Sequence, residues 1–235
     1  MSEYLLEAKN VTKTFKIGGL VFGSKLTAVS NVNLAFNKDS AEIITLAGES
    51  GSGKTTLLML LGALIKPSEG RIIYDGQDIT RFSEDEAAEW RQKNIGFVFQ
   101  KINLIEFLNA LDNVLLPLYP LNVDFSVLEK KALKLLERVG LSERVTHKPA
   151  QLSVGEQQRV AIARALIGDP KVVLADEPTA HLDTETGKKI IKLMKELNEE
   201  LGVTFIVSTH DPEMTSVADR IIKIRDGKIV GIEYL

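Results

Sequence analysis

The chain has 235 residues, of which 44% are hydrophobic, and its formal net charge is −3. This length suits one α/β domain with an appended lobe or two small domains, and the hydrophobic content predicts a folded core rather than disorder. The weakly negative charge implies no broad basic surface, so nucleic acid is disfavoured as the main partner. Cysteine is absent, which excludes disulfides, thiol catalysis and thiolate metal sites.

Nothing in the sequence reads as a targeting or membrane-spanning segment. No charged and then apolar stretch at the N-terminus is typical of a signal peptide. The longest apolar run, 57–65, is much shorter than the roughly 20 residues that span a bilayer. We therefore expect a soluble chain, which another protein would have to hold if it works at a membrane.

The first half of the chain predicts strands and two helices. The expected strands, in which apolar and β-branched residues predominate, span 5–11, 28–34, 42–47, 71–74 and 95–99. The stretch 18–24, which contains three glycines, looks like the tip of a long hairpin. A helix is expected from Lys54 to about Ala63, and a capping-box pattern at 83–86 predicts another to about Lys93.

The second half alternates longer helices with short apolar strands. Helices are expected over 126–139, with a capping box at Ser126 and Glu129, and over 155–167 and 185–201. Strands are expected over 172–175, 204–207, 220–224 and 228–232, and Asp211-Pro212 should start a further helix. This order predicts an α/β fold: a parallel core sheet with a helical insertion between about Gln100 and Ala165.

The most informative motif is Gly48-Glu49-Ser50-Gly51-Ser52-Gly53-Lys54-Thr55, which fits the pattern G-x-x-x-x-G-K-[ST] between an expected strand and an expected helix. Glycines let the backbone curl so that several N–H groups face one anion, and the following helix adds its positive end. Lys54 would then hold the β- and γ-phosphates of a nucleotide, and Thr55 would bind Mg²⁺. The alternative is a Gly/Ser-rich surface turn.

A pair of carboxylates follows the apolar run 172–175. Asp176 falls at the carboxyl end of a buried strand, where open α/β sheets bind ligands and where a carboxylate can hold Mg²⁺. Successive strand residues point to opposite faces, so the strand must end here if Glu177 is to face an attacking water. The alternative is that both carboxylates are simply solvated at the end of the strand.

The segment from Leu152 to Leu166, Leu-Ser-Val-Gly-Glu-Gln-Gln-Arg-Val-Ala-Ile-Ala-Arg-Ala-Leu, closely resembles the LSGGQ signature of ABC transporter ATPases. Other elements of that family stand in the same order along essentially the whole chain. Phe15 matches the aromatic A-loop, Gln100 the Q-loop, 177–183 the Walker B end and the D-loop, and His210 the switch histidine.

The resemblance implies a P-loop NTPase fold of the ABC ATPase type in a single domain over 1–235. Its core would comprise 1–99 and 166–235, with an antiparallel β region at the N-terminus and a mostly parallel core sheet. A helical subdomain would occupy about 100–165.

The resemblance also implies a role for each site residue. ATP would contact Phe15, which would stack on adenine, and Gly48, Glu49, Ser50, Gly51, Ser52, Gly53, Lys54, Thr55 and Thr56. Mg²⁺ would be held by Thr55, Gln100 and Asp176. Catalysis would use Lys54, Glu177 as general base and His210 as a partner of the γ-phosphate. Ser153, Gly155 and Asp183 would act on ATP bound by a second ATPase subunit, most simply in a homodimer.

Several of these residues also have plainer interpretations. Phe15 could be an ordinary core aromatic, and Gln100 an ordinary surface amide after a strand. Ser153 could simply cap a helix. His147 and His181 are expected to be packed or solvated residues without a role in the site.

Two signature positions depart from the family pattern: Val154 replaces a glycine and Glu156 replaces glutamine. Valine restricts the backbone, and glutamate adds negative charge near the phosphate of the second subunit. Within the family, the segments 95–100, 103–105 and 112–118 resemble the lipoprotein-release and macrolide-export subfamily (LolD/MacB-like), together with the cell-division ATPase FtsE.

The function implied is an ATP-hydrolysing subunit that drives a separate transmembrane permease from the cytoplasmic face of the membrane. An apolar stretch around 104–111 could receive a helix of that permease, although core packing could explain part of it. The alternative is an FtsE-like, ATP-gated scaffold without transport. ATPases of DNA repair or translation are less consistent, because neither a coiled-coil insertion nor a second cassette is present.

Overall fold

The computed structural model describes residues 3–17, 24–120 and 124–235. The chain divides into two compact units, a first unit of 1–89 and 208–235 and a second unit of 90–207. The subdomain boundaries near 100 and 165 that the sequence suggests stay a prediction.

An antiparallel sheet forms one part of the first unit, in the strand order β2-β1-β4-β5. These strands are β1 (Tyr4–Ile17), β2 (Ser24–Asn37), β4 (Glu69–Tyr74) and β5 (Gln77–Asp78). The first two are longer than expected, because β1 and β2 keep pairing through polar residues as far as Ile17 and Ser24. Most of the expected hairpin tip, 18–23, lies outside the described residues.

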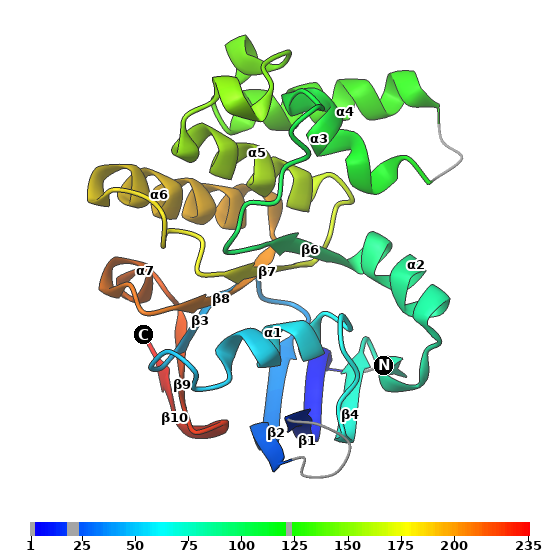
Figure 1. The fold of residues 1–235 in the computed structure, drawn as a ribbon, viewed down its shortest axis with the longest axis vertical. Helices are drawn as coiled ribbons and strands as arrows, with labels where there is room; N and C mark the ends of the chain where they lie inside the picture. The colour runs from blue at the N-terminus through cyan, green and yellow to red at the C-terminus, as the bar shows by residue number, and fades with distance from the viewer. Residues whose placement is uncertain (1–2, 18–23, 121–123) are drawn as a thin grey trace. The chain divides into compact units, whose positions relative to one another are not determined.

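The rest of the first unit surrounds the glycine loop. Strand β3 (Ile43–Ala47) pairs in parallel with β9 (Arg220–Arg225), and β9 pairs antiparallel with β10 (Lys228–Tyr234). Helix α1 (Lys54–Leu61) follows the loop and lies against β1 and β2, and α7 (Pro212–Ser216) lies against β3. Figure 1 shows α1 beside these strands. The α1 helix ends earlier than expected, since Ala63 takes a left-handed φ of 52°.

The capping box expected at Ser83 is confirmed. The Ser83 N–H donates to the Glu86 carboxylate at 2.7 Å, and the Glu86 N–H donates to Ser83 Oγ at 3.3 Å. These bonds start α2 (Glu84–Asn94), within which the boundary between the units falls. A short 3-10 turn, η1 (Ile79–Arg81), precedes it.

The second unit combines short buried strands with most of the helices. Strands β6 (Ile95–Val98) and β7 (Val172–Asp176) pair in parallel, and β8 (Thr204–Thr209) lies next to β7. Helices α3 (Ala110–Leu115), α4 (Phe125–Arg138) and α5 (Val154–Leu166) form one group, as Figure 1 shows, and α6 (Thr184–Leu201) packs against α5. Three 3-10 turns complete the unit: η2 (Leu116–Leu118), η3 (Ser142–Arg144) and η4 (Pro149–Gln151).

The capping box expected at Ser126 is wrong. Helix α4 begins at Phe125, and its N-cap is Asp124, whose carboxylate accepts a hydrogen bond of 2.9 Å from the Ser126 N–H. An aspartate two residues upstream satisfies that backbone donor first, because its carboxylate is as good a cap as a serine hydroxyl. Ser126 is therefore a residue of the first helical turn.

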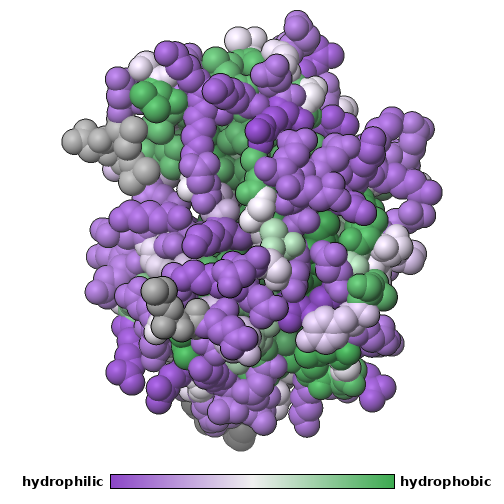
Figure 2. All heavy atoms as spheres, turned by 180° about the vertical axis from the view of Figure 1, so that it is seen from behind, coloured by the Kyte–Doolittle hydropathy of each residue, from purple (hydrophilic) through white to green (hydrophobic). Residues whose placement is uncertain are grey.

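The surface offers no wide apolar face in the view of Figure 2, where hydrophilic residues predominate. Within the part of the chain that the structure describes, no helix is both long and apolar enough to cross a bilayer.

Candidate functional site

The glycine loop of the first unit has the backbone that only glycine adopts easily. Gly51 and Gly53 have φ angles of 78° and 104°. A Cβ on Gly53 would lie 2.3 Å from the carbonyl oxygen of Ala28, and one on Gly48 would lie 2.2 Å from that of Ile224. The loop is thus pressed against β2 and β9, and these glycines cannot be replaced without moving backbone.

Lys54 is turned inward on this loop and is only 5% exposed. Its Nζ donates to the carbonyl oxygens of Gly48 at 2.7 Å and of Glu49 at 2.8 Å. Ser52 Oγ is also buried and has no hydrogen-bond partner within the described residues. A buried cation, an unpaired hydroxyl and the start of α1 thus converge on one loop, which is the chemistry of a phosphate site.

Two further candidate residues belong to the first unit. Phe15 lies on β1 with its side chain 37% exposed, and Lys13 Nζ lies 5.3 Å from the centroid of its ring. Its exposure excludes the interpretation as an ordinary core aromatic. His210 is exposed and directly follows β8; Asp211 after it caps α7, as expected, by accepting from the Glu213 N–H at 2.9 Å.

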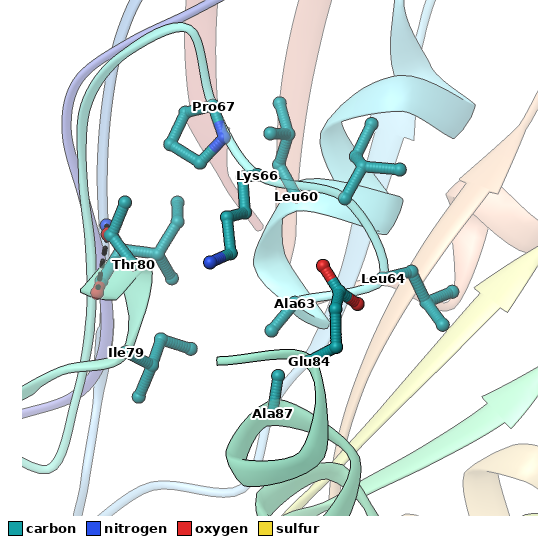
Figure 3. Close-up of a pocket in the computed structure, with 11 residues that line it drawn as sticks. Leu60, Ala63, Leu64, Lys66, Pro67, Ile79, Thr80, Glu84 and Ala87 are labelled. Carbon is teal, nitrogen blue, oxygen red and sulfur yellow. Dashed lines mark hydrogen bonds between the residues drawn. The ribbon is translucent and has the colours of Figure 1, made fainter. Parts of the chain in front are cut away.

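A small hollow of the first unit lies at the other end of α1 from the glycine loop. Figure 3 shows the side chains of Lys66 and Glu84 extending into the space that Leu60, Ile79 and Ala87 help to surround. Its volume of about 20 Å³ has room for roughly one water molecule. It is therefore too small for a nucleotide, and the glycine loop remains the candidate for that ligand.

In the second unit, the chain leaves its strand geometry between Asp176 and Glu177. Strand β7 ends at Asp176, and Glu177 takes a left-handed φ of 44°. This conformation costs a non-glycine residue free energy, and such strain concentrates at functional sites. The strand thus ends where the sequence required it to end, so the two carboxylates are not held to opposite faces of a strand.

The signature segment starts α5 with a reciprocal cap. The Ser153 N–H donates to the Glu156 carboxylate at 2.8 Å, and the Glu156 N–H donates to Ser153 Oγ at 3.3 Å. The interpretation of Ser153 as a helix cap is therefore confirmed. It does not compete with a role toward phosphate, because a helix N-terminus is itself favourable for anions.

Gly155 brings the signature next to the D-loop. A Cβ on Gly155 would lie 2.5 Å from Thr186 Cγ2. The Thr186 N–H in turn donates to the Asp183 carboxylate at 3.0 Å. The Thr186 side chain first, and this backbone N–H after it, lower the pKa of Asp183. The starts of α5 and α6 therefore meet at Thr186, with Ser153, Gly155 and Asp183 in one region of the second unit.

Val154 fits without strain. It is the first residue of α5, is 45% exposed, and is not among the described residues with positive φ. The backbone therefore does not require a glycine at position 154. Packing against Thr186 does require one at position 155.

Gln100 is exposed and lies shortly after the end of β6. The segment after it borders a hollow of about 570 Å³ within the second unit. Its lining comes from this segment, from the loop before α5 and from the D-loop, and comprises Lys101, Ile102, Asn103, Leu104, Glu106, Pro149, Ala150, Val154, Gln157 and His181. The exposed His181 thus faces a hollow rather than the core.

Two residues that organise this region lie in segments with a family resemblance, but the sequence alone assigns neither of them a role. Arg164 on α5 donates to the carbonyl oxygens of Asn103 at 2.7 Å and Ile102 at 2.8 Å. Asn113 on α3 is fully buried and bonds both the N–H and the carbonyl of Ile105. Together they fix the loop after Gln100.

The candidate residues therefore fall into two sets. The first unit holds Phe15, the loop 48–56 and His210, and the second holds Gln100, Ser153, Gly155, Asp176, Glu177 and Asp183. Among the described residues, no group of three or more histidine, aspartate or glutamate side chains could hold a metal ion. The donors proposed for Mg²⁺ are a hydroxyl, an amide and a carboxylate, which are oxygen ligands of the kind that this cation prefers.

A parallel strand, a glycine loop with an inward lysine, and a helix define a P-loop nucleotide-binding protein. The family described as ABC transporter matches residues 29–180, and the chain belongs to this family. As a member, it is an ATP-binding subunit that hydrolyses ATP. The signature and D-loop that meet at Thr186 agree with this membership.

Two similar proteins support the assignment to the LolD/MacB-like subfamily. The lipoprotein-releasing system ATP-binding protein LolD of Idiomarina loihiensis is 43% identical over 97% of this chain and 97% of its own. The macrolide export ATP-binding/permease protein MacB of Vibrio parahaemolyticus is also 43% identical, but the chain spans only 34% of its length. These likenesses do not favour the scaffold alternative.

Solved structures agree with the fold. The dimeric structure of MJ0796, a bacterial ABC transporter cassette by its description, has a TM-score of 0.87 and 44% identity, with 98% of each chain covered. A second dimeric structure of MJ0796, in a post-hydrolysis state bound to ADP and Pi, has a TM-score of 0.86. The α/β fold with an antiparallel β region expected from the sequence is confirmed.

Proposed function

We propose that this subunit holds the phosphates of ATP in the loop 48–56 and its adenine on Phe15. The observation that carries the proposal is the inward Lys54, whose Nζ reaches two loop carbonyls at 2.7 and 2.8 Å. Phosphate oxygens would offer the ammonium stronger, charge-assisted hydrogen bonds than those carbonyls do. The exposed ring of Phe15 supports its role, because stacking needs only an accessible face.

Thr55, Gln100 and Asp176 would hold Mg²⁺, which would neutralise charge on the phosphates when bound. Glu177 acts as the general base: it accepts a proton from the water whose oxygen attacks the γ-phosphorus. The bond to the β–γ bridging oxygen breaks, and ADP and phosphate leave. His210 donates a hydrogen bond to the γ-phosphate. The left-handed backbone of Glu177, φ 44°, supports this assignment, because such strain is retained where a side chain must be aimed.

A second copy of the subunit completes the reaction. Ser153, Gly155 and Asp183 face the ATP of that copy in a homodimer that forms on ATP binding and separates after hydrolysis. Their grouping around Thr186 supports this, since one region of the second unit then holds all three. The dimeric MJ0796 structures support the same assembly.

The permease contacts the loop after Gln100, and it holds the subunit at the cytoplasmic face of the membrane. Phe107 supports this placement, because its side chain is 76% exposed in a loop that Asn113 fixes from within. A rigid loop with an exposed aromatic side chain is typical of the anchor residues of protein interfaces. Core packing explains Ala110 of the same stretch, which is buried.

Nucleotide binding tests the proposal, with Lys54→Ala compared with Lys66→Ala. Lys66 is an exposed lysine at the other end of α1 and makes a matched control. Titration with a fluorescent ATP analogue should show binding weakened about 10-fold or more for Lys54→Ala, through the loss of charge-assisted bonds. Lys66→Ala should bind as the parent does. Equal binding by parent and Lys54→Ala, with both folded by circular dichroism, would overturn the phosphate site.

A further inference from the structure

Glu156 is the acidic residue of the signature segment, and its side chain is paired with Arg144, 12 residues before it in the sequence. Arg144 Nε donates to Glu156 Oε1 at 3.0 Å, while Oε2 of the same carboxylate accepts the Ser153 N–H at 2.8 Å. One carboxylate thus joins a guanidinium to the backbone of the residue that caps α5. Both side chains are partly exposed, Arg144 by 45% and Glu156 by 28%.

Hydrogen bonds fix the backbone around Arg144, so this residue stays close to Glu156. The Arg144 N–H donates to the Leu141 carbonyl at 2.9 Å, and the Arg144 carbonyl accepts from the His147 N–H at 2.9 Å. The next residues bond to the start of α3, where the Leu111 N–H donates to Val145 at 3.1 Å. Arg144 therefore presents its guanidinium from a rigid turn.

The charge of Glu156 would otherwise oppose the role proposed for the signature. A carboxylate beside Ser153 would repel the phosphates of ATP on a second copy, and it would cancel part of the positive end of α5. The guanidinium neutralises this charge while leaving the carboxylate free to accept the Ser153 N–H. Glu156 thus caps α5 without repelling the phosphates of ATP on the second copy.

We propose that Arg144 is a positioning residue of the composite ATP site: by pairing with Glu156, it holds Ser153 and removes the repulsion between the signature and the ATP of the second subunit. This inference rests on the proposed function, because it assumes that Ser153 faces that ATP. In this chain, Arg144 would therefore offset the negative charge that Glu156 adds to the signature.

The test compares Arg144→Gln, Glu156→Gln and the double variant with the parent. Nucleotide binding by the monomer, ATP-dependent dimerisation by sedimentation velocity, and the ATPase rate are measured at 50 and 500 mM NaCl. Arg144→Gln should bind nucleotide as the parent does but dimerise about fivefold or more weakly at low salt, and the defect should shrink at high salt as the repulsion is screened. Lys192→Gln, which breaks an exposed pair with Glu196, is the matched control and should behave as the parent.

Rescue separates electrostatics from a merely structural role. Glu156→Gln removes the charge yet keeps an oxygen that can accept the Ser153 N–H, so the double variant should recover dimerisation. A double variant as weak as Arg144→Gln, or a single variant equal to the parent, would overturn the inference. Failure of the proposed function looks different, because the parent itself would then neither dimerise with ATP nor hydrolyse it.

Discussion

Arg164 donates a hydrogen bond of 2.7 Å to the carbonyl oxygen of Asn103, which lies 61 residues before it in the sequence. A second bond, of 2.8 Å, reaches the carbonyl of Ile102. Burial lowers the pKa of Arg164. A guanidinium nevertheless keeps its charge in proteins. A charged side chain of the signature helix therefore holds the segment that follows Gln100.

Arg164→Met should destabilise the protein by about 2–3 kcal/mol, since it removes bonds from a charged donor and leaves two carbonyls without it. Urea denaturation measures this loss, and amide hydrogen exchange should become faster over 102–105. Arg138→Met is the control, because Arg138 is exposed and lies 3.9 Å from Glu200 in a weak pair worth about 0.5 kcal/mol. Equal losses in the two variants would contradict the role of Arg164.

Gly155→Ala should destabilise the second unit by about 1–3 kcal/mol through overpacking, because its Cβ would meet Thr186 Cγ2 at 2.5 Å. Thr186→Ser removes that methyl group and keeps the N–H that donates to the capping carboxylate of Asp183, so the double variant should regain most of the stability. Thermal unfolding measures both effects. Gly187→Ala, where the nearest atom would be at 3.8 Å, serves as control and should cost nothing. A double variant no better than Gly155→Ala would show that the contact is not the cause.

Acid should weaken the two helix caps of the signature and the D-loop. The Ser153 N–H, and after it the Arg144 guanidinium, lowers the pKa of Glu156 below its ordinary 4.5, and bonds from Thr186 lower that of Asp183 below 3.8. Because the folded-state pKa values lie below those of the unfolded chain, these carboxylates stabilise the protein above the ordinary values, and the stabilisation is lost as the pH falls through the folded ones.

The unfolding free energy should therefore fall below about pH 4.5, and it should fall less steeply in Glu156→Gln than in the parent. Denaturant titrations at pH 7, 5, 4 and 3 measure the two slopes. Glu129→Gln, a change at a partly exposed residue of α4 whose parent carboxylate is not part of a cap, should leave the parent slope unaltered. Identical slopes in parent and Glu156→Gln would contradict the capping role.

Local patterns were enough to predict the glycine loop, the end of β7 before Glu177 and the caps at Ser153 and Asp211. Each depends on residues within a few positions, where backbone sterics and capping decide the structure. The sequence does not indicate the Asp124 cap, because Ser126 and Glu129 have the spacing of a capping box, which predicts a later start of the helix. Other contacts join residues that are separated in sequence or lie in irregular loops, so no periodic pattern predicts them. They are the pair Arg144–Glu156, the bonds of Arg164 and the bonds of Asn113. The pattern Ser153-x-x-Glu156 did carry a visible signal, since it is a capping box.

The most direct test of the central claim is a single-turnover measurement of ATP hydrolysis by the parent and by Glu177→Gln, with Mg²⁺ present and nucleotide binding measured in parallel. Glu185→Gln, an exposed carboxylate at the start of α6 that pairs with Lys189, is the matched control. We predict that Glu177→Gln binds ATP as tightly as the parent but hydrolyses it about 10²-fold or more slowly, and that Glu185→Gln hydrolyses it at the parent rate. Hydrolysis by Glu177→Gln at the parent rate would contradict the account.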